Sequence, residues 1–356
     1  MKRMNPLESE AVAAWCKAFV CCAAGILGLM LSSVVAAQTQ LPSTALVVGA
    51  SKVADRSVSE WLMRTHEASR RRAYVGTFVV LAGGTLSSSR IWHVCDGEQQ
   101  MERVESLTGA PRSTFRRNDQ VLTFLPESRV VIAEKRESLG LFPNLLQSND
   151  SSIAQFYRIK AAGSERVAGF EADVVQLRPE DSLRFGYRVW TEKKTGLVVK
   201  LQTLDGAGHV LEQAAFSELQ LDAPVSMGKL TQMMDKTEGY QIEKPAMVKT
   251  TAAAEGWVLK NAVPGFKPMS CYKRPVGAGA DTRHENTMQW VFSDGLASVS
   301  LFVEAFDPRR HGQPGGLAMG ATHTLTRRIG DWWLTAVGEV PAQTLAVFAQ
   351  GLERKK

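Results

Sequence analysis

Hydrophobic and polar residues alternate with a period of two along much of the chain. The clearest stretch is VWTEKKTGLVVKLQTLDGAGHVLEQ, residues 189–213, in which Leu197, Val199 and Leu201 point to one side and Lys200 to the other. A Thr-Gly and an Asp-Gly dipeptide interrupt the extended runs where turns are expected. This pattern predicts a β-meander.

The same alternation predicts a series of strands before the meander, with Gly-rich and Asn-Asp dipeptides as turns. We predict these strands at residues 74–81, 86–94, 98–104, 112–117, 120–125, 129–134, 157–162, 170–177 and 183–191. With the meander they number about eleven, and almost no helix lies among them. Such a series indicates one large, curved antiparallel sheet.

Helices are predicted at the two ends of this pattern. Ser57 and Glu60 form a capping box at the start of a helix that ends near the arginines at 70–72. Pro341 suits the first position of a helix close to the C-terminus. The buried stripe of that second helix is predicted to be Leu345, Phe348 and Leu352.

The alternation stops in a stretch that we interpret as a linker between two domains. Residues 222–254 mix charge, methionine and proline, and they separate a β-rich domain at 57–221 from a second domain at 255–356. The second domain contains an alternating strand after FSDG, a hairpin that turns at residues 330–331, and the terminal helix. These elements predict a second folded domain.

The N-terminus has the features of an export signal. Three basic residues precede an apolar run over residues 18–35. Val35 and Ala37 are small enough for the −3 and −1 positions of a signal peptidase site, so we predict a signal peptide at 1–37 and a loose lead-in at 38–56. A signal anchor that stays in the membrane is the alternative, although the apolar run is near the lower length for a span.

The charge of the chain narrows the range of partners. The formal net charge is +6, and it falls to +5 when the signal peptide removes three basic and two acidic residues. An exported protein does not normally meet nucleic acid, and a mildly basic one fits an acidic protein partner or anionic lipid head groups. For any single basic pair, a solvated surface is the plainer interpretation.

Two cysteines remain after export. Cys95 and Cys271 would lie in an oxidising compartment, where a disulfide is permitted. They belong to distant halves of the chain, and the sequence does not show whether their geometry allows a bond. Their pairing stays open.

The sequence contains no catalytic or metal-binding motif. There is no G-x-S-x-G elbow, no phosphate loop and no C-x-x-C. The His284-Glu285 pair lacks the second histidine of a zinc site, and His93 is interpreted as a structural histidine in a strand. Two distant carboxylates could converge into a glycosidase site, but no motif supports one. We therefore expect a binding protein without enzymatic activity, metal or cofactor.

Aromatic residues are concentrated in the predicted large sheet. They form an ordinary core in the simplest interpretation. A curved sheet with only two helical segments to cover it would also leave an apolar cavity in which a lipid could bind. The candidate cavity residues are Phe78 and Trp92 in the strands, and Leu141, Phe142, Leu145 and Leu146 in the covering segment LGLFPNLLQ.

A series of motifs appears in a characteristic order along both domains. The first domain carries WLMRTHEAS, YVGTFVV, SRIWHVCDG, LTGAPRS, ERVAGFEADVVQLRPEDSLRFGYRVWTEKKTGLVVK and LEQAAFSEL, and the second carries PGF, FSDGLASVSLFVE and VGEVPAQTL. In this order the chain resembles the RseB/MucB family. The most specific part is RFGYRVWTEKKTGLVVK followed by LEQAAF.

The resemblance implies a periplasmic negative regulator of the sigma-E envelope-stress response. It implies a LolA/LolB-like antiparallel half-barrel with covering helices and a smaller C-terminal α+β domain. The implied partner is the periplasmic segment of a membrane-spanning anti-sigma factor of the RseA/MucA type, which binding shields from proteolysis. Lipopolysaccharide or lipoprotein acyl chains are implied to relieve the shielding. A periplasmic lipid or lipoprotein carrier is the alternative, although simple LolA/LolB carriers lack the second domain, and homo-oligomerisation stays open.

The C-terminal hairpin offers candidate contacts for the anti-sigma segment. Arg327 and Arg328 end one strand, and Trp332 and Trp333 begin the next. Adjacent strand residues face opposite sides, so one tryptophan is expected in the core and the other at least partly exposed. We take Arg327, Arg328 and Trp333 as contact candidates, because an exposed tryptophan beside arginine is a typical interface anchor. The alternative is that Trp333 packs on the linker or on the first domain.

Overall fold

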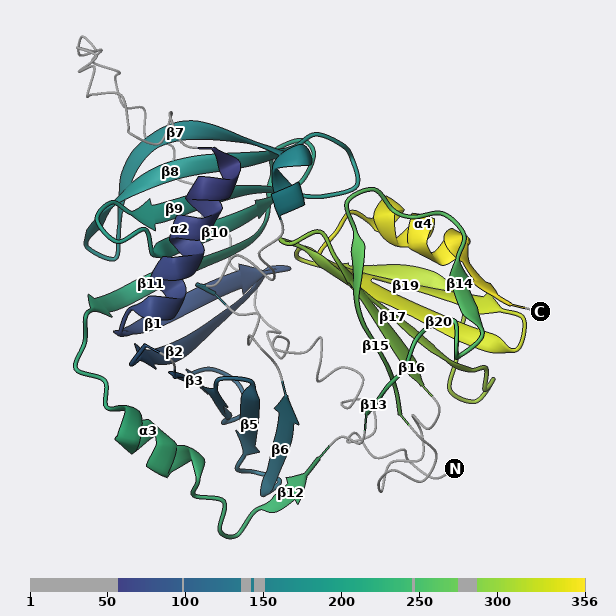
Figure 1. Cartoon of the computed structure of the whole chain (residues 1–356), viewed down its shortest axis with the longest axis horizontal. Coiled ribbons are helices and arrows are strands. Elements are labelled where there is room, and N and C mark those ends of the chain that lie inside the picture. Colours follow the sequence, from purple (N-terminus) through teal and green to yellow (C-terminus); the bar gives the residue numbers. More distant parts are fainter. Residues whose placement is uncertain are drawn as a thin grey trace, which may run out of the picture.

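The computed structural model describes residues 57–97, 99–135, 142–143, 151–244, 247–274 and 287–355. Within these ranges the chain forms two β-rich domains, each built on one large sheet (Figure 1). No helix in the described ranges is long and apolar enough to cross a membrane. The predicted signal peptide and lead-in lie outside the described residues, as do Leu141, Leu145 and Leu146.

The N-terminal domain is built on the larger sheet. Its twelve strands within the described chain follow the order β12-β6-β5-β4-β3-β2-β1-β11-β10-β9-β8-β7. They are β1 (Tyr74–Ala82), β2 (Thr85–Cys95), β3 (Gln100–Ser106), β4 (Ser113–Arg117), β5 (Gln120–Leu125), β6 (Val130–Lys135), β7 (Tyr157–Val167), β8 (Phe170–Pro179), β9 (Gly186–Glu192), β10 (Val198–Leu204), β11 (Val210–Leu221) and β12 (Gln241–Glu243). All neighbours are antiparallel except β12, which runs parallel to β6. The predicted curved antiparallel sheet is confirmed.

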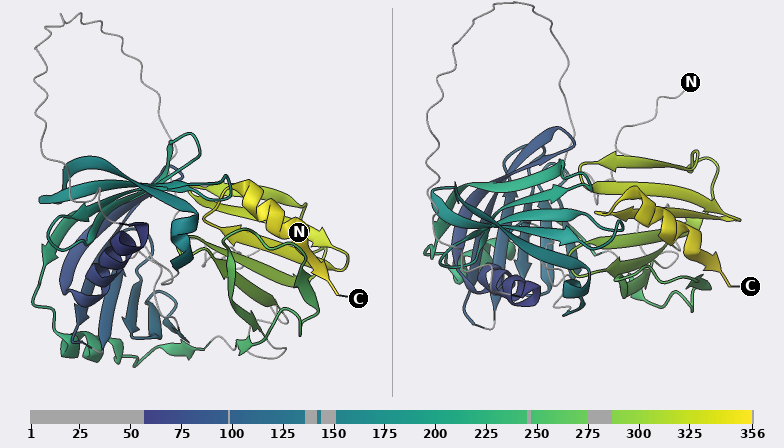
Figure 2. Two further views of the ribbon diagram at one scale, coloured as in Figure 1. Left: turned by 45° about the horizontal axis from the view of Figure 1, so that its top comes forward. Right: turned by 90° about the horizontal axis from the view of Figure 1, so that it is seen from above.

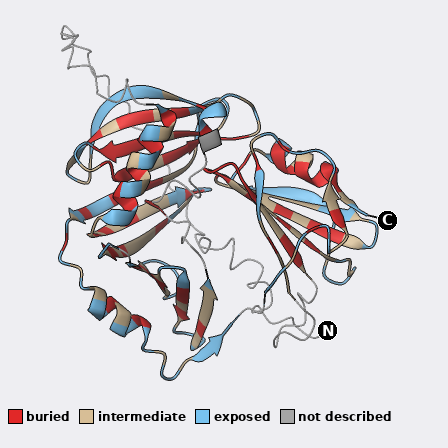
Figure 3. Ribbon diagram, viewed as in Figure 1, coloured by how far each residue is buried: buried red, intermediate tan, exposed pale blue. Residues whose placement is uncertain are grey.

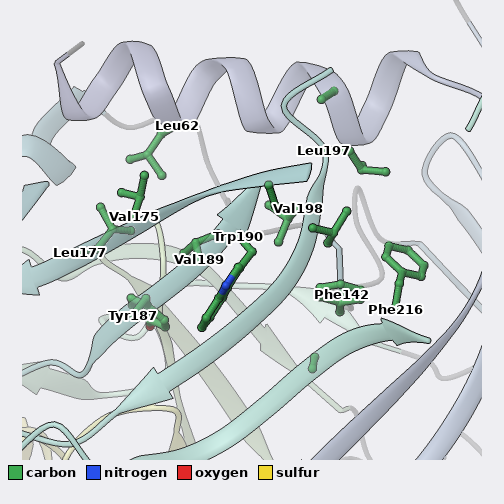
Figure 4. Packing of buried hydrophobic residues seen from close by; sticks show 14 of the residues in the cluster. Leu62, Phe142, Val175, Leu177, Tyr187, Val189, Trp190, Leu197, Val198 and Phe216 are labelled. Carbon is green, nitrogen blue, oxygen red and sulfur yellow. The ribbon is translucent and has the colours of Figure 1, made fainter. Parts of the chain in front are cut away.

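Helix α2 (Val58–Arg71) lies inside the curve of this sheet (Figure 2). The capping box predicted at its start is confirmed, because Ser57 Oγ accepts from the backbone N–H of Glu60 at 3.2 Å and Glu60 Oε2 accepts from Ser57 at 3.0 Å. Trp61 and Leu62 are fully buried on the inner face of the sheet, where Leu62 points towards the strands beneath the helix (Figure 4). The short 3₁₀ helix η3 (Ser151–Gln155) also contacts α2.

Helix α3 (Met227–Met234) lies on the outer face of the same sheet (Figure 2). Its buried side chains, Leu230 and Met234, belong to a second apolar cluster with Met101 and Phe115. The stretch predicted as a linker is therefore structured in part, since α3 covers apolar side chains and β12 extends the sheet. Figure 3 shows the other side of α3 exposed to solvent, as expected for a single amphipathic helix on a surface.

The C-terminal domain is a seven-stranded sheet within the described residues, in the order β13-β15-β16-β17-β20-β19-β18. The strands are β13 (Val248–Lys249), β15 (Lys267–Lys273), β16 (Met288–Ser293), β17 (Ser298–Ala305), β18 (Gly315–Met319), β19 (Thr322–Ile329) and β20 (Trp332–Gly338), and a separate pair joins β14 (Trp257–Leu259) to β21 (Leu352–Arg354). Helix α4 (Ala342–Gly351) packs on one face through Leu345 and Phe348. Pro341 is its N-cap, one residue before the predicted position.

Candidate functional site

A buried arginine joins the two domains. Arg184, in the loop between β8 and β9, has no exposed side-chain surface, and the same holds for Asp294 of the C-terminal domain. Arg184 Nε donates to Asp294 Oδ2 at 2.9 Å, and its Nη2 donates to the carbonyl oxygen of Pro264 at 2.6 Å. Its Nη1 pairs with Asp181 in its own loop. Each nitrogen of the guanidinium therefore has a partner, which is what a buried charge requires.

Further contacts surround this ion pair. Tyr157 in β7 donates its hydroxyl to the same Asp294 oxygen at 3.3 Å. Thr344 in α4 donates to the carbonyl oxygen of Leu183 at 2.7 Å, and Leu296 packs into the core of the N-terminal domain. Each domain thus contributes side chains to the interior of the other. A junction of this kind fixes how the domains meet more firmly than a linker alone would.

The domains meet at a second point, where the β1–β2 turn faces the β18–β19 turn. A Cβ atom on Gly320 would lie 3.1 Å from the Cβ of Ala82, and its φ of +60° also favours glycine at this close approach. Glu212 in β11 accepts a hydrogen bond from the backbone N–H of Ala321. Burial in this contact raises the pKa of Glu212 to about 7, and the Glu339 carboxylate adds to the rise.

The inner face of the N-terminal sheet brings together two of the predicted lipid-cavity residues. Phe142 is buried, with its ring centroid 5.6 Å from Phe78 and 4.9 Å from Phe216 (Figure 4). The described part of the covering segment therefore packs against the inner face of this sheet. Phe142 itself fills the space between these strands, so the three rings form a packed aromatic cluster.

Trp92 does not belong to this cluster, and its prediction as a cavity residue is wrong. In the β1–β2 register Phe78 pairs with Ser89, so Trp92, three residues further on, points to the outer face. There it packs against the apolar cluster under α3, with the guanidinium of Arg103 4.7 Å from its ring. Strand register, which the sequence does not show, decided its face.

A buried polar ladder crosses β1 to β4 on the inner face. Tyr74, His93, Glu102 and Arg116 are cross-strand neighbours. Arg116 Nε donates to Glu102 Oε2 at 2.8 Å, and His93 Nδ1 lies 2.6 Å from the carbonyl oxygen of Arg72. Burial lowers the pKa of His93, which favours the neutral ring. These contacts support the structural role predicted for His93, whereas alternation alone gave no sign of the ladder.

The two candidate arginines of the C-terminal hairpin lie on opposite faces of the sheet. Arg327 pairs with Leu334 and reaches the α4 face, where its Nη1 donates to the carbonyl oxygen of Ala349 at 2.7 Å. A basic group at that end of a helix stabilises its last turn. Arg328 faces the other way, with its guanidinium 3.9 Å from the ring of Phe306. Both residues remain exposed.

The tryptophan pair divides between interior and surface as predicted, but Trp332 is the partly exposed member. Trp333 is 5 % exposed and stacks on His311 at 5.0 Å. It packs within its own domain, so both the exposed-anchor hypothesis and the alternative contact with the first domain are wrong for Trp333. Trp332 packs edge-on against Trp257, with the Arg354 guanidinium 4.2 Å from its ring.

Comparisons with known proteins identify the domains. Residues 57–234 match the model of the MucB/RseB N-terminal domain, and residues 251–353 match that of the MucB/RseB C-terminal domain. The chain belongs to the MucB/RseB family. Within this family it is 29% identical over 310 residues to the sigma factor AlgU regulatory protein MucB of Pseudomonas aeruginosa, covering 84% of this chain and 91% of that protein. It is 21% identical over 313 residues to the sigma-E factor regulatory protein RseB of Escherichia coli K12, covering 88% and 96%.

Two solved structures of MucB are also similar to this MucB/RseB chain. MucB in complex with MucA(peri) matches with a TM-score of 0.63 and 26% identity over 84% of this chain and 100% of that chain. The Pseudomonas aeruginosa MucA/MucB complex matches with a TM-score of 0.65 and 25% identity over 84% and 99%. The similarity therefore extends across both domains.

This member of the MucB/RseB family has no metal cluster and no disulfide in the part of the chain that the structure describes. No group of three or more His, Cys, Asp or Glu side chains there is arranged to hold a metal ion. Cys95 and Cys271 are free thiols. Burial raises the pKa of Cys271 to about 11, which makes its thiol a poor nucleophile.

Proposed function

We propose that this protein binds the periplasmic segment of a membrane-spanning anti-sigma factor and shields that segment from proteolysis. The observation that carries the proposal is the match, over 84% of the chain, to a MucB solved in complex with MucA(peri). The names of the curated relatives describe regulation of the sigma factors AlgU and sigma-E. Export by cleavage after Ala37 would place the mature chain in the periplasm, where such a segment lies.

The buried contacts between the domains support a binding surface made by both domains. The Arg184–Asp294 pair joins the domains, so residues of both can be presented to one partner at a smaller ordering cost on binding. Arg327 and Arg328 remain candidates for peripheral contacts, and Trp332 replaces Trp333 as the aromatic candidate.

The test is calorimetric titration of the mature chain, from Gln38 onwards, with the anti-sigma factor's periplasmic segment. We expect saturable binding, and slower cleavage of the segment by the protease that initiates its degradation. No binding would contradict the function. Binding with unchanged cleavage would contradict the shielding. The anti-sigma segment would then be a partner that the protein binds for another purpose.

A second proposal is that an acyl chain binds on the inner face of the N-terminal sheet and relieves the shielding. It rests on the aromatic cluster, because Phe142 occupies apolar space between Phe78 and Phe216 on the inner face of the sheet. Burial of an acyl chain contributes about 0.8 kcal/mol per CH₂. This is enough for the acyl chain to compete with one phenylalanine ring for the apolar space. A lipid or lipoprotein carrier would use the same face, and the absence of any anti-sigma binding would favour that alternative.

Binding of a fluorescent fatty acid to the mature chain tests the lipid proposal. Phe142→Asp should weaken binding by about tenfold or more, because a carboxylate would replace apolar surface in the site. Leu107→Asp, at an exposed residue that is not part of the aromatic cluster, is the matched control and should bind as the unmodified protein does. Equal affinity of both variants, with their circular dichroism unchanged, would remove Phe142 from the site.

A further inference from the structure

The edge strands of the two large sheets differ in how they are protected. Edge strands expose unpaired backbone N–H and C=O groups, and proteins usually place charged residues there to prevent pairing with other chains. In the described chain β7, β12 and β13 each carry at least one charged residue. Strand β18, with the sequence GGLAM, carries none, and Leu317 at its centre is 72 % exposed.

A hollow lies directly beside this unprotected edge, on the face of the sheet that α4 covers. It has a volume of about 240 Å³, and its walls include Ala318, His323, Leu325, Ala342 and Leu345. Its lining is almost entirely apolar. An extended peptide paired with β18 would direct every second side chain to this face. One large apolar side chain of that peptide would then fill the hollow.

The hollow also indicates that a second copy of this chain is the wrong occupant. In the β18–β19 register Gly316 pairs with Leu325 and Ala318 with His323, so β18 directs only Gly316 and Ala318 to the α4 face. A symmetric β18–β18 pair would place glycine or alanine beside each hollow and leave both unfilled. The fitting occupant is a different segment, with a larger side chain at the corresponding position.

We propose that the anti-sigma segment binds by adding a strand to the edge of β18, with one large apolar side chain in the adjacent hollow. This inference rests on the function proposed above and specifies its contact. Backbone hydrogen bonds to the strand would supply affinity, and the hollow would select the side chain. The occupant is thus defined chemically as an extended segment with alternating side chains, apolar on the side that meets α4.

The position of β18 also explains why both domains would be needed. Its last residue, Met319, lies against the β1–β2 turn, since a Cβ atom on Gly83 would be 3.2 Å from Met319 Cγ. Leu81 and Leu86 pair with each other just before and after that turn, and they are 44 % and 61 % exposed. An added strand that extends past Met319 would reach this leucine pair. The end of β18 therefore lies next to a turn of the N-terminal domain that is flanked by exposed apolar residues.

Two variants of the full mature chain test the contact by titration with the anti-sigma periplasmic segment. Gly316→Leu directs a side chain towards the hollow, and its Cβ would have only the carbonyl oxygen of Thr324 nearby, at 3.6 Å, so the backbone can accept it and the fold should be retained. Leu317→Lys places a charge on the edge. Each should weaken binding by about tenfold or more. Val248→Lys, at an exposed residue on the opposite edge of the same sheet, should change affinity less than about twofold.

Hydrogen exchange on the unmodified complex gives a second readout that depends on no variant. Amides of residues 315–319 should become protected when the segment binds. Binding of unmodified protein without this protection, or full affinity of Gly316→Leu and Leu317→Lys, would overturn the strand contact while leaving the function intact. Failure of the unmodified protein to bind would contradict the function itself. Self-association that is lost in Leu317→Lys would assign the edge to a second copy and also overturn the inference.

Discussion

The side chain of Arg184 has no exposed surface, so its positive charge is buried. The stability of the folded protein therefore depends on the partners that compensate this charge. Arg184→Met would leave the Asp294 carboxylate buried with its main compensating charge removed. We expect this change to lower the free energy of unfolding by about 3–5 kcal/mol in urea titration of the mature chain. The loss follows from the uncompensated carboxylate more than from lost packing, because methionine fills similar space.

Two comparisons separate that cause from a general effect of losing an arginine. Arg158 pairs with Glu180 on the surface and is 80 % exposed, so Arg158→Met should cost less than about 1 kcal/mol. Adding Asp294→Asn to Arg184→Met should recover part of the loss, since the buried charge is then removed. A double variant no more stable than Arg184→Met would show that packing, and not charge, governs the junction.

At the scale of elements, helix α2 depends on its N-terminal cap. Ser57 Oγ accepts the N–H of Glu60, which otherwise has no partner inside the helix. Ser57→Ala should therefore lower stability by about 1 kcal/mol in thermal or urea unfolding. Ser59→Ala, two residues further along and within the helix, is the matched control and should be nearly neutral. Equal effects of the two changes would mean that the cap does not stabilise the domain.

At the scale of the whole molecule, the contact between the two domains should respond to pH. The pKa of Glu212 is raised from 4.5 to about 7, so the folded state favours its protonated form. A raised carboxyl pKa contributes stability that is present below pH 4.5 and is lost as pH rises through 7. We expect unfolding free energy to fall by up to about 3 kcal/mol across this window through Glu212.

The difference between unmodified protein and Glu212→Gln isolates this contribution from other titrating groups. The introduced amide cannot ionise, so the variant should lose less stability between about pH 5 and pH 8 when urea unfolding is measured at both values. Glu218→Gln, on an exposed position of the same strand, should keep the pH dependence of the unmodified protein. Parallel pH profiles for all three proteins would show that Glu212 does not couple the domain contact to pH.

Local patterns of the sequence by themselves determined most strands of the N-terminal sheet and the two helices α2 and α4. Residues 120–125 were predicted and form β5 with the same bounds, and the Ser57 cap and the buried Leu345 and Phe348 were predicted as they occur. These features depend on neighbours a few residues apart, so local periodicity and capping chemistry suffice to find them. Phe78 and Phe142, predicted as the lining and the cover of one cavity, are in contact, since both are large apolar residues in elements that face each other.

Only the tertiary structure decided which face each side chain occupies and which distant residues meet. Trp92 turned to the outer face because the β1–β2 register pairs Phe78 with Ser89, and a one-residue shift would have reversed it. The Arg184–Asp294 pair joins residues 110 positions apart, and nothing in either local sequence marks the other as its partner. The exposed edge of β18 likewise depends on strand order, since a strand of the same composition at the centre of the sheet would have no free backbone groups.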